Sequence, residues 1–420
     1  MKNNILKSLT VAGKCLAVLI TLAMASCNKT LPDATPIIYP PVNNVAISIG
    51  TVIDTDPGYS IFKAAAAKYK AATKVDIIAL LSDSNKVFTA FVPNDAAFQA
   101  SGFPNWAAVD AFVPLPSLAA ILQYAIVPGE QFLSTNASLN TMPNLQLPTS
   151  LTIGVLPGTT VPLKMSLFLS KRGNNFWVNT IPVVSPDNKY KNGVIHLVGG
   201  IVAPPSQLLR DAIYGNPNLT YFKAAIARAD SGASGLGKLD SLLGYGVTNM
   251  TVLAPNDAAF KTLIFGLAFQ GYLAIRPKPY TANDTSNAVL TANGAVAAGP
   301  IFLATNNITT AQVKGIMAYH FLATNTPAGY QPNIRVFSNN FATTPGVFYT
   351  TLVNTSVPAT LQPGIMIQAT FAGPFVSSLQ FTGVHTFPPT GAPYTGPAAM
   401  SVTKDNFAVN GVYHVIDKVL

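Results

Sequence analysis

The six residues Pro-Asn-Asp-Ala-Ala-Phe occur at positions 93–98 and again, unchanged, at positions 255–260. Each copy follows an apolar, β-prone run, Val87–Val92 in the first case and Thr251–Ala254 in the second. Proline ends such a strand, the asparagine oxygen can cap a following helix, and aspartate is favourable at that helix's positive N-terminus. The phenylalanine then returns to the core one turn later. The residues for which this motif predicts a structural role are Pro93, Asn94, Asp95, Phe98, Pro255, Asn256, Asp257 and Phe260.

Two further landmarks repeat in the same order. Phe-Lys-Ala-Ala stands at 62–65 and at 222–225, upstream of the hexapeptide. Asn-Gly-Val-Ile-His-Leu-Val at 192–198 corresponds to Asn-Gly-Val-Tyr-His-Val-Ile at 410–416, downstream of it. Landmarks that recur in one order over such a long period indicate a two-domain array and not a solenoid of short repeats.

The predicted domains span residues 45–204 and 205–420. The second is longer, because 56 more residues separate its hexapeptide from its closing motif. One insertion is expected within Arg276–Pro300, whose Pro, Thr, Asn, Ala and Gly content is typical of a surface loop. The other is expected within Gly329–Pro397. Since the shared positions explain the fold, we expect these two loop insertions to carry specificity.

His196 and His414 belong to the closing motif and share strand faces with valine or isoleucine. Such a histidine is either a core residue satisfied by a hydrogen bond or a ligand or catalytic base. No Ser, Cys or carboxylate stands nearby at a spacing that would obviously pair with it, so the structural role is favoured.

The composition of the 420-residue chain excludes several classes of protein. Charged residues make up 10% and hydrophobic residues 49%, which excludes a disordered chain and a heptad coiled coil. The 33 Pro and 30 Gly favour short elements with many turns. The formal net charge of +9 is scattered, without basic runs interleaved with aromatics, so nucleic acid is not an expected partner.

Residues 1–26 have the three parts of a secretory signal peptide: early lysines, an apolar stretch over Leu16–Met24, and small residues before Cys27. Met24-Ala25-Ser26-Cys27 resembles a bacterial lipobox, with Met24 in place of the more usual leucine. We therefore predict lipidation of Cys27. The alternatives are cleavage elsewhere or an uncleaved membrane anchor, for which the apolar stretch is short.

Residues 27–44 form a predicted tether, in which four prolines favour an extended spacer. Cys15 would be lost with the leader and Cys27 acylated, which leaves no pair for a disulfide. These features predict an exported protein that is lipid-anchored to the outer membrane and faces either the periplasm or the cell surface.

The motifs together resemble the fasciclin-1 (FAS1) domain. The family's Thr-x-Phe/Leu-Ala-Pro-x-x-x-Ala-Phe motif corresponds to 89–98 and 251–260, and its closing motif to 192–202 and 410–420. The resemblance implies an α+β fold, with a β-sandwich or wedge-like sheet core and several packed helices. It also implies adhesion or ligand binding without catalysis. The family's central Tyr-His pair, linked to receptor contact, is present only as Tyr319-His320, because the first domain has Tyr124-Ala125.

The sequence predicts no enzyme, metal site or cofactor. Its four histidines, at positions 196, 320, 385 and 414, are not spaced as helical or strand metal ligands. The chain contains no Gly-x-Ser-x-Gly motif, no phosphate-binding loop and no dinucleotide fingerprint. The expected function is adhesion or binding of an envelope or extracellular protein.

Two other functions stay open: a glycan-binding accessory protein of a polysaccharide-uptake system, and a structural envelope subunit. Sugar rings stack on exposed aromatic side chains, and several tyrosines lie in or near the long segments of domain two. These tyrosines either contact a partner or cover loops. The candidate partner-binding residues are Tyr272, Tyr280, Tyr319, His320, Tyr330 and Tyr394.

Overall fold

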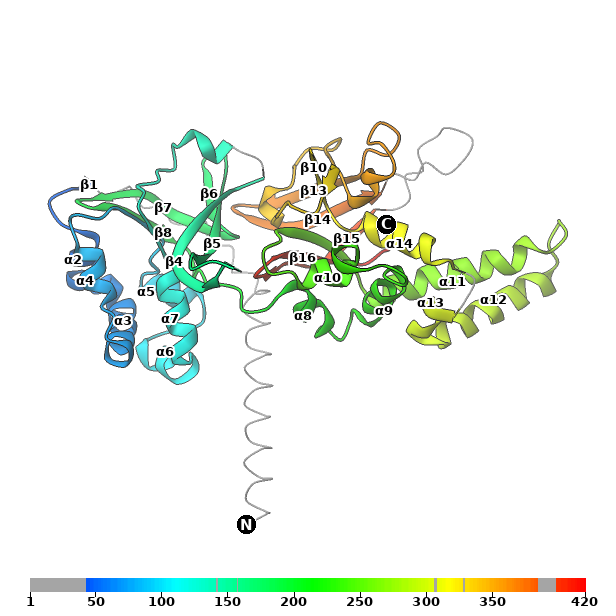
Figure 1. Cartoon of the computed structure of the whole chain (residues 1–420), viewed down its shortest axis with the longest axis horizontal. Helices are drawn as coiled ribbons and strands as arrows, with labels where there is room; N and C mark the ends of the chain where they lie inside the picture. The colour runs from blue at the N-terminus through cyan, green and yellow to red at the C-terminus, as the bar shows by residue number, and fades with distance from the viewer. Residues whose placement is uncertain (1–42, 141–142, 157, 306–307, 328, 384–397) are drawn as a thin grey trace, which may run out of the picture. The chain divides into compact units, whose positions relative to one another are not determined.

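The computed structural model describes residues 43–420 except 141–142, 157, 306–307, 328 and 384–397 (Figure 1). The predicted signal peptide, Cys27, nearly all of the tether and Tyr394 lie outside the described residues. The chain divides into two compact units. The first unit consists of residues up to Ala203 without two short segments, Ala137–Gln146 and Phe168–Lys171. The second comprises Pro204–Leu420, and Ala137–Gln146 and Phe168–Lys171 group with it.

The helices of the first unit gather on one side of its sheet (Figure 1). The longest of them, α3, buries Ile61, Phe62, Ala65, Ala66 and Tyr69, which share one face at helical spacing. These side chains pack with Ala90 and Ile195 of the sheet. The helices are α2 (Ile49–Thr55), α3 (Ser60–Thr73), α4 (Ile77–Ser82), α5 (Asp95–Ala100), α6 (Trp106–Phe112) and α7 (Leu115–Tyr124).

The described strands of the first unit form one eight-stranded sheet in the order β3-β2-β8-β7-β6-β5-β4, with β1 pairing alongside β7. Strands β2 and β8 are parallel, with Thr89 opposite Val194, whereas β7 and β8 are antiparallel with two register shifts. The strands are β1 (Asn43–Asn44), β2 (Phe88–Ala90), β3 (Ile126–Pro128), β4 (Leu145–Val155), β5 (Pro162–Arg172), β6 (Asn175–Val178), β7 (Ile181–Tyr190) and β8 (Gly193–Val198).

The second unit repeats this plan. The pair β9 and β16 is parallel, with Leu253 opposite His414, and β15 pairs antiparallel with β16 through two register shifts, as β7 does with β8. The six-stranded sheet has the order β12-β13-β14-β15-β16-β9. The strands of this unit are β9 (Met250–Pro255), β10 (Thr324–Thr326), β11 (Gly329–Gln331), β12 (Phe348–Tyr349), β13 (Ile365–Ala372), β14 (Phe375–Gly383), β15 (Ala399–Ala408) and β16 (Gly411–Ile416).

Helices of the second unit cover one side of its sheet, where Val252 and Val415 meet Phe222, Ile226 and Met317. A second cluster, which includes Leu253, Phe341 and Phe381, fills the other side. The helices are α8 (Leu209–Tyr214), α9 (Thr220–Ala229), α10 (Leu239–Gly244), α11 (Asp257–Ala274), α12 (Ala282–Ala297), α13 (Phe302–Thr305) and α14 (Thr310–Tyr319). The predicted α+β class, with a sheet core and packed helices, is confirmed in both units.

The first insertion of domain two is a helical hairpin, and the prediction of a loop within Arg276–Pro300 is wrong. Helix α11 continues to Ala274, whereas its counterpart α5 stops at Ala100, and α12 runs back beside it (Figure 1). Thr281 and Asp284 form a capping box that starts α12. Buried alanines at 288, 292 and 295 give α12 a packing face, although its Asn, Thr and Gly content is typical of a loop.

The range Gly329–Pro397, a part of which was expected to form the second insertion, contains strands β11 to β14, and its residues 384–397 lie outside the described part. Among the described residues, no single helix has the length and apolarity needed to cross a bilayer. The pair α6 and α7 meets that requirement only when taken together, and the two helices are bent by 120°.

Candidate functional site

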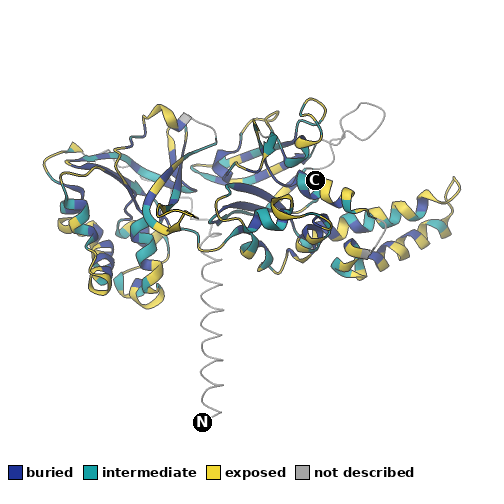
Figure 2. Ribbon diagram, in the orientation of Figure 1, coloured by how far each residue is buried: buried dark blue, intermediate teal, exposed yellow. Residues whose placement is uncertain are grey.

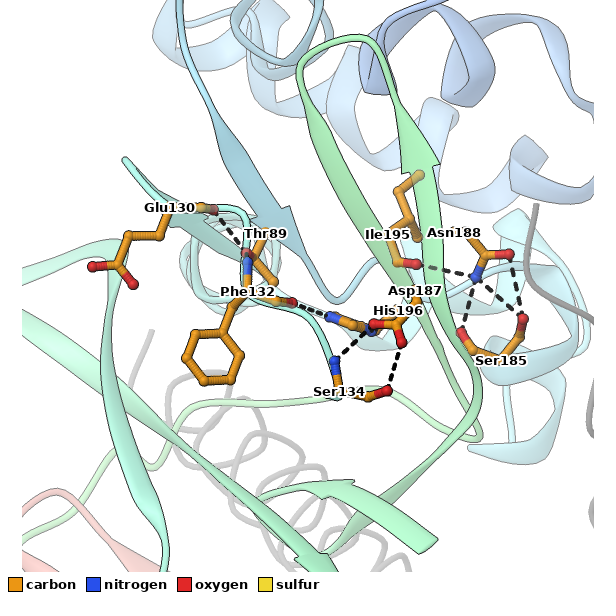
Figure 3. A network of polar contacts seen from close by, with 9 residues as sticks. All are labelled: Thr89, Glu130, Phe132, Ser134, Ser185, Asp187, Asn188, Ile195 and His196. Atoms are coloured by element: carbon orange, nitrogen blue, oxygen red, sulfur yellow. Dashed lines mark hydrogen bonds and ion pairs between the residues drawn. The ribbon is translucent and has the colours of Figure 1, made fainter. Parts of the chain in front are cut away.

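The imidazole of His196, on β8, is completely buried and held at both nitrogens (Figure 3). Its Nε2 lies 2.8 Å from the carbonyl oxygen of Phe132, and its Nδ1 accepts the backbone N–H of Asp187 at 3.1 Å. Since a carbonyl can only accept and an N–H can only donate, the proton resides on Nε2 and the ring is neutral. The sequence prediction of a hydrogen-bonded core histidine agrees with this geometry.

Asp187 was missed by the sequence analysis, although it lies beside His196 across the β7–β8 hairpin. Its backbone is left-handed, with φ 63°, and its carboxylate accepts the N–H of Ser134 at 2.7 Å and the Ser134 hydroxyl at 2.5 Å. Ser134, Asp187 and His196 thus come together as in a catalytic triad. However, the serine hydroxyl donates to the aspartate, and Nδ1 of the histidine accepts a backbone N–H from Asp187, so the histidine is not placed to act as a base toward the serine.

Thr89, on β2, ties the same loop to the sheet. Its hydroxyl donates to the carbonyl of Glu130 at 2.8 Å and accepts the N–H of Phe132 at 2.8 Å (Figure 3). The threonine of the Thr-x-Phe/Leu-Ala-Pro motif therefore has a structural purpose: one hydroxyl satisfies two backbone groups of a loop that has no sheet partner there.

Aromatic rings enclose the His196 imidazole. Phe91 stacks on it with centroids 5.2 Å apart, and Phe176 meets it edge-on at 5.3 Å. Burial lowers the pKa of His196 below its ordinary value, against the opposing effects of the hydrogen bond to Phe132 and the charge of Asp187. The histidine therefore stays neutral at physiological pH and has no access to a substrate.

The second unit repeats the Thr, Ser, Asp and His contacts of this cluster around His414, with Val336 in the place of Phe132. Val336 carbonyl lies 3.0 Å from Nε2, and the N–H of Asp405 donates to Nδ1 at 3.3 Å. Asp405 is also left-handed, with φ 58°, and accepts the N–H of Ser338 at 2.6 Å and its hydroxyl. Thr251 donates to a carbonyl at 2.6 Å and accepts the N–H of Val336 at 2.8 Å. Burial again lowers the histidine pKa, here that of His414.

The asparagines of the closing motif are equally repeated. Asn192 accepts the N–H of Ile49 at 2.9 Å and donates to Leu81 carbonyl at 2.8 Å. Asn410 accepts the N–H of Leu209 at 2.8 Å and donates to a carbonyl at 2.9 Å. Both fasten the first helix of their unit to the strand end, so the Asn-Gly dipeptide is more than a turn signal.

The residues of the hexapeptide lie where the sequence predicts, and its aspartates make a second set of bonds that the sequence did not predict. Asn94 and Asn256 cap their helices through Ala97 and Ala259 N–H at 2.9 and 2.8 Å. Asp95 lies in the first turn of its own helix α5, as expected, and its carboxylate also bonds to the start of α3, accepting the N–H of Ile61 at 2.9 Å and the hydroxyl of Ser60 at 2.6 Å.

Asp257 makes the equivalent bonds to the N–H of Tyr221 and the hydroxyl of Thr220 at 3.0 and 2.7 Å. The phenylalanines at 98 and 260 are buried core residues of their units.

Tyr319 and His320 lie in the interior. The Tyr319 hydroxyl donates to Gly364 carbonyl at 2.8 Å, and His320 accepts the N–H of Leu420 at Nε2 at 3.1 Å. Tyr124 is similarly buried in the first unit and donates to Ser166 carbonyl at 2.9 Å. Direct contact between Tyr319-His320 and a partner would require these side chains to leave the core, and their predicted binding role stays untested.

Two of the predicted tyrosines lie near the turn of the α11–α12 hairpin. The Arg276 guanidinium stands 4.4 Å from the Tyr272 ring centroid, and the Lys278 ammonium 5.9 Å from that of Tyr280. Tyr330 lies apart from them on β11 and is half-buried. The structure thus brings Tyr272 and Tyr280 onto one element, while Tyr394 is outside the described residues.

Among the described residues, no group of three or more His, Cys, Asp or Glu side chains is arranged to hold a metal ion. A shallow surface hollow on one face of α3 is lined by Ala67, Lys70, Ala71 and Lys74. These four residues lie along one exposed helix stripe and bring no converging polar groups from elsewhere.

Comparisons with known proteins agree with the geometry of the first unit. Residues 60–204 match the family model described as the Fasciclin domain. No curated protein matches. One similar solved structure is a FAS1 domain pair from the insect cell adhesion molecule fasciclin I, with 12% identity over 86% of this chain and 96% of that chain and a TM-score of 0.29. The similarity to a known family is thus to the Fasciclin domain, within residues 60–204.

Proposed function

We propose that this chain is a non-enzymatic, lipid-anchored cell-envelope protein that mediates adhesion or protein binding. The family match of residues 60–204 supports a binding role without catalysis. Anchoring through Cys27 rests on the lipobox-like sequence alone.

One observation carries the proposal: the chemically versatile residues that the two units share are used inside the fold. In each Ser-Asp-His set the serine and histidine are buried and the aspartate is partly buried, the serine bonds to the aspartate, and the histidine is neutral. A binding function must then come from residues outside this shared framework. The α11–α12 hairpin is the largest described element that the second unit has and the first lacks.

Glycan binding is the second candidate, because Tyr272 and Tyr280 place aromatic rings on that hairpin. Stacking on a sugar face would use the side of each ring that its cation leaves open. A structural envelope subunit is the third candidate and would use the same unshared surface for one dedicated partner.

The test is capture of envelope and matrix proteins, and of arrayed glycans, by the protein and by a truncated hairpin variant. The variant replaces Gly271–Ser286 with a short Gly-Asn-Gly turn, which removes both tyrosines but keeps the buried alanines of α12. We expect capture to fall at least tenfold while circular dichroism stays native.

A matched control, Leu236→Ser, removes an exposed apolar side chain (56% exposed) elsewhere in the same unit and should capture normally. Equal capture by the folded truncation variant would refute the assignment to the hairpin. Turnover of a polysaccharide by the protein would refute the non-enzymatic function.

A further inference from the structure

The turn of the α11–α12 hairpin, residues Tyr272–Tyr280, exposes an unusual set of side chains, and we call it the hairpin tip. Ile275 is 78% exposed, the highest value among the large hydrophobic side chains that the structure describes. Figure 2 shows this region largely in the colour of exposed residues. Transfer of this exposed aliphatic side chain from water into an apolar environment would lower the free energy.

The charge of the hairpin tip has one sign. Arg276 and Lys278 are the only charged residues between Lys261 and Asp284. Both are exposed, and each lies against a tyrosine ring, at 4.4 Å for Arg276 and 5.9 Å for Lys278. A cation–π contact leaves the formal charge of each cation in place, and the opposite charge that acts on Arg276 is that of Asp284 in the first turn of α12, outside the tip.

We propose that the hairpin tip binds an anionic lipid surface, with Arg276 and Lys278 at the headgroup phosphates and Ile275 below them. This combination of basic, tyrosine and aliphatic side chains suits a membrane interface: cations meet phosphate, amphipathic rings lie at headgroup depth, and an apolar side chain reaches the acyl boundary. The proposal rests on the proposed function only in treating the hairpin as a contact element.

The same observations favour lipid over a sugar or a folded protein. A cation covers one face of each tyrosine ring, and the tip shows no convergent hydrogen-bond donors and acceptors of the kind that orient a sugar. The tip alone offers a folded partner little area, so a protein partner would contact the adjoining start of α12, which the truncation also removes, whereas a fluid headgroup layer can deform around the tip.

A lipidated Cys27 would give the protein a second membrane signal beside the hairpin tip. A lipid anchor combined with a basic, apolar patch binds membranes more durably than a single weak signal.

The experiment places an environment-sensitive dye on the tip of the full chain. Cys15→Ser and Cys27→Ser remove the native thiols, and Ala274→Cys carries the dye beside the intact Ile275. A second protein carries the dye at Leu236→Cys, in the short 3₁₀ helix Gly235–Gly237. Both are titrated with vesicles of phosphatidylcholine alone or mixed with phosphatidylglycerol.

We expect emission from position 274 to shift to the blue on the anionic vesicles only, and emission from position 236 to stay unchanged. Neutralising both cations, Arg276→Gln with Lys278→Gln, should lower the vesicle affinity obtained from the titration about 25-fold, since each basic residue near an anionic surface contributes about fivefold. Ile275→Ser should lower the same affinity about tenfold. The matched control, Lys223→Gln with Lys314→Gln, removes the same charge from exposed positions of the same unit and should change nothing.

An unshifted dye at 274 on the anionic vesicles overturns the proposal, as does a shift that survives neutralisation of both cations. A shift produced by glycans or by a captured protein, without lipid, would assign the tip to those partners and also overturn it. Failure of the proposed function is distinguishable, because it would appear as unchanged capture by the truncated hairpin while the lipid-dependent shift persists.

Discussion

Asp187 donates its backbone N–H to Nδ1 of His196 at 3.1 Å, while its carboxylate accepts two hydrogen bonds from Ser134. The left-handed φ of 63° at Asp187 allows both, because it turns the N–H toward the histidine and leaves the side chain free to reach the loop. Asp405 and His414 repeat this relationship in the second unit. The residues that most resemble catalytic machinery therefore fasten a loop to a sheet.

Acid should destabilise the protein through these histidines. Burial lowers the pKa of His196 and His414 in the folded state, while the unfolded chain titrates near the ordinary value of about 6.5. Below that pH the unfolded state binds more protons than the folded state. The contribution of the neutral histidines to the free energy of unfolding is therefore fully present above pH ~6.5, and it is lost as the pH falls toward the lowered pKa of the folded state. Each histidine contributes up to about 1.4 kcal/mol per pH unit.

Urea unfolding at pH 7.5, 6.0 and 5.0 measures this dependence. The variant His196→Gln with His414→Gln should be less stable at pH 7.5 but lose less stability on acidification. An equally steep loss in that variant would show that other groups govern the acid sensitivity.

Asp187→Ala should destabilise the first unit by about 2–4 kcal/mol. It leaves two donors of Ser134 without their acceptor and puts alanine at a positive φ. Asp187→Asn should cost about 1 kcal/mol, since asparagine tolerates the left-handed region and retains one acceptor oxygen.

The two tryptophans make this prediction specific, because Trp106 and Trp177 both belong to the first unit. Asp187→Ala should lower the unfolding midpoint seen by tryptophan fluorescence. The matched variant Asp405→Ala should lower the midpoint seen by circular dichroism and leave the fluorescence transition in place. A fluorescence midpoint unchanged by Asp187→Ala would contradict the structural role of the cluster.

The hexapeptide and the closing motif predicted much of the fold because their physics is local. Proline ends a strand, asparagine caps the helix that follows by accepting the N–H three residues later, and alternating apolar residues define a buried strand. Those signals lie within a few residues of one another, and the copies at 93–98 and 255–260 made them visible twice. The α+β class and the buried histidines follow from them.

The Ser-Asp-His sets could not be found in this way, because Ser134 and Asp187 meet only after the sheet forms. One signal was available: Asp187-Asn188 and Asp405-Asn406 are separated by the same 218 residues as the two histidines. The hairpin was missed for another reason. Its Asn, Thr and Gly residues are weak helix formers one by one, and packing of the alanine face on α11 overrides that weakness.

Gly193→Ala should unfold the first unit or cost at least about 3 kcal/mol. Gly193 has φ 146°, and a Cβ there would stand 2.0 Å from the carbonyl oxygen of Phe88, which lies opposite it in the parallel β2–β8 pair. Since that oxygen belongs to the backbone of a central strand, relief requires the strands to separate.

The control for this variant is Gly315→Ala on α14, where a Cβ would meet nothing within 4 Å. Alanine is a better helix former there and should stabilise the second unit by about 0.5–1 kcal/mol. Thermal unfolding followed by tryptophan fluorescence and circular dichroism separates the two effects. A Gly193→Ala protein with a native fluorescence transition would show that the strands are not as close as the structure has them.

Ala292→Leu should loosen the hairpin without affecting the first unit. Ala292 is completely buried where α12 packs on α11. The three added carbons of leucine would force the helices apart and lower the stability by about 1–3 kcal/mol. Leu290→Ala removes as many carbons from a side chain that is 68% exposed on the same helix, and should change stability by no more than about 0.5 kcal/mol. Amide hydrogen exchange gives the readout: faster exchange across Asp257–Ala297 in Ala292→Leu, native rates in Leu290→Ala, and no change around His196 in either. Faster exchange in both variants would mean that the hairpin depends on its outer face, and the alanine stripe would not be what holds it together.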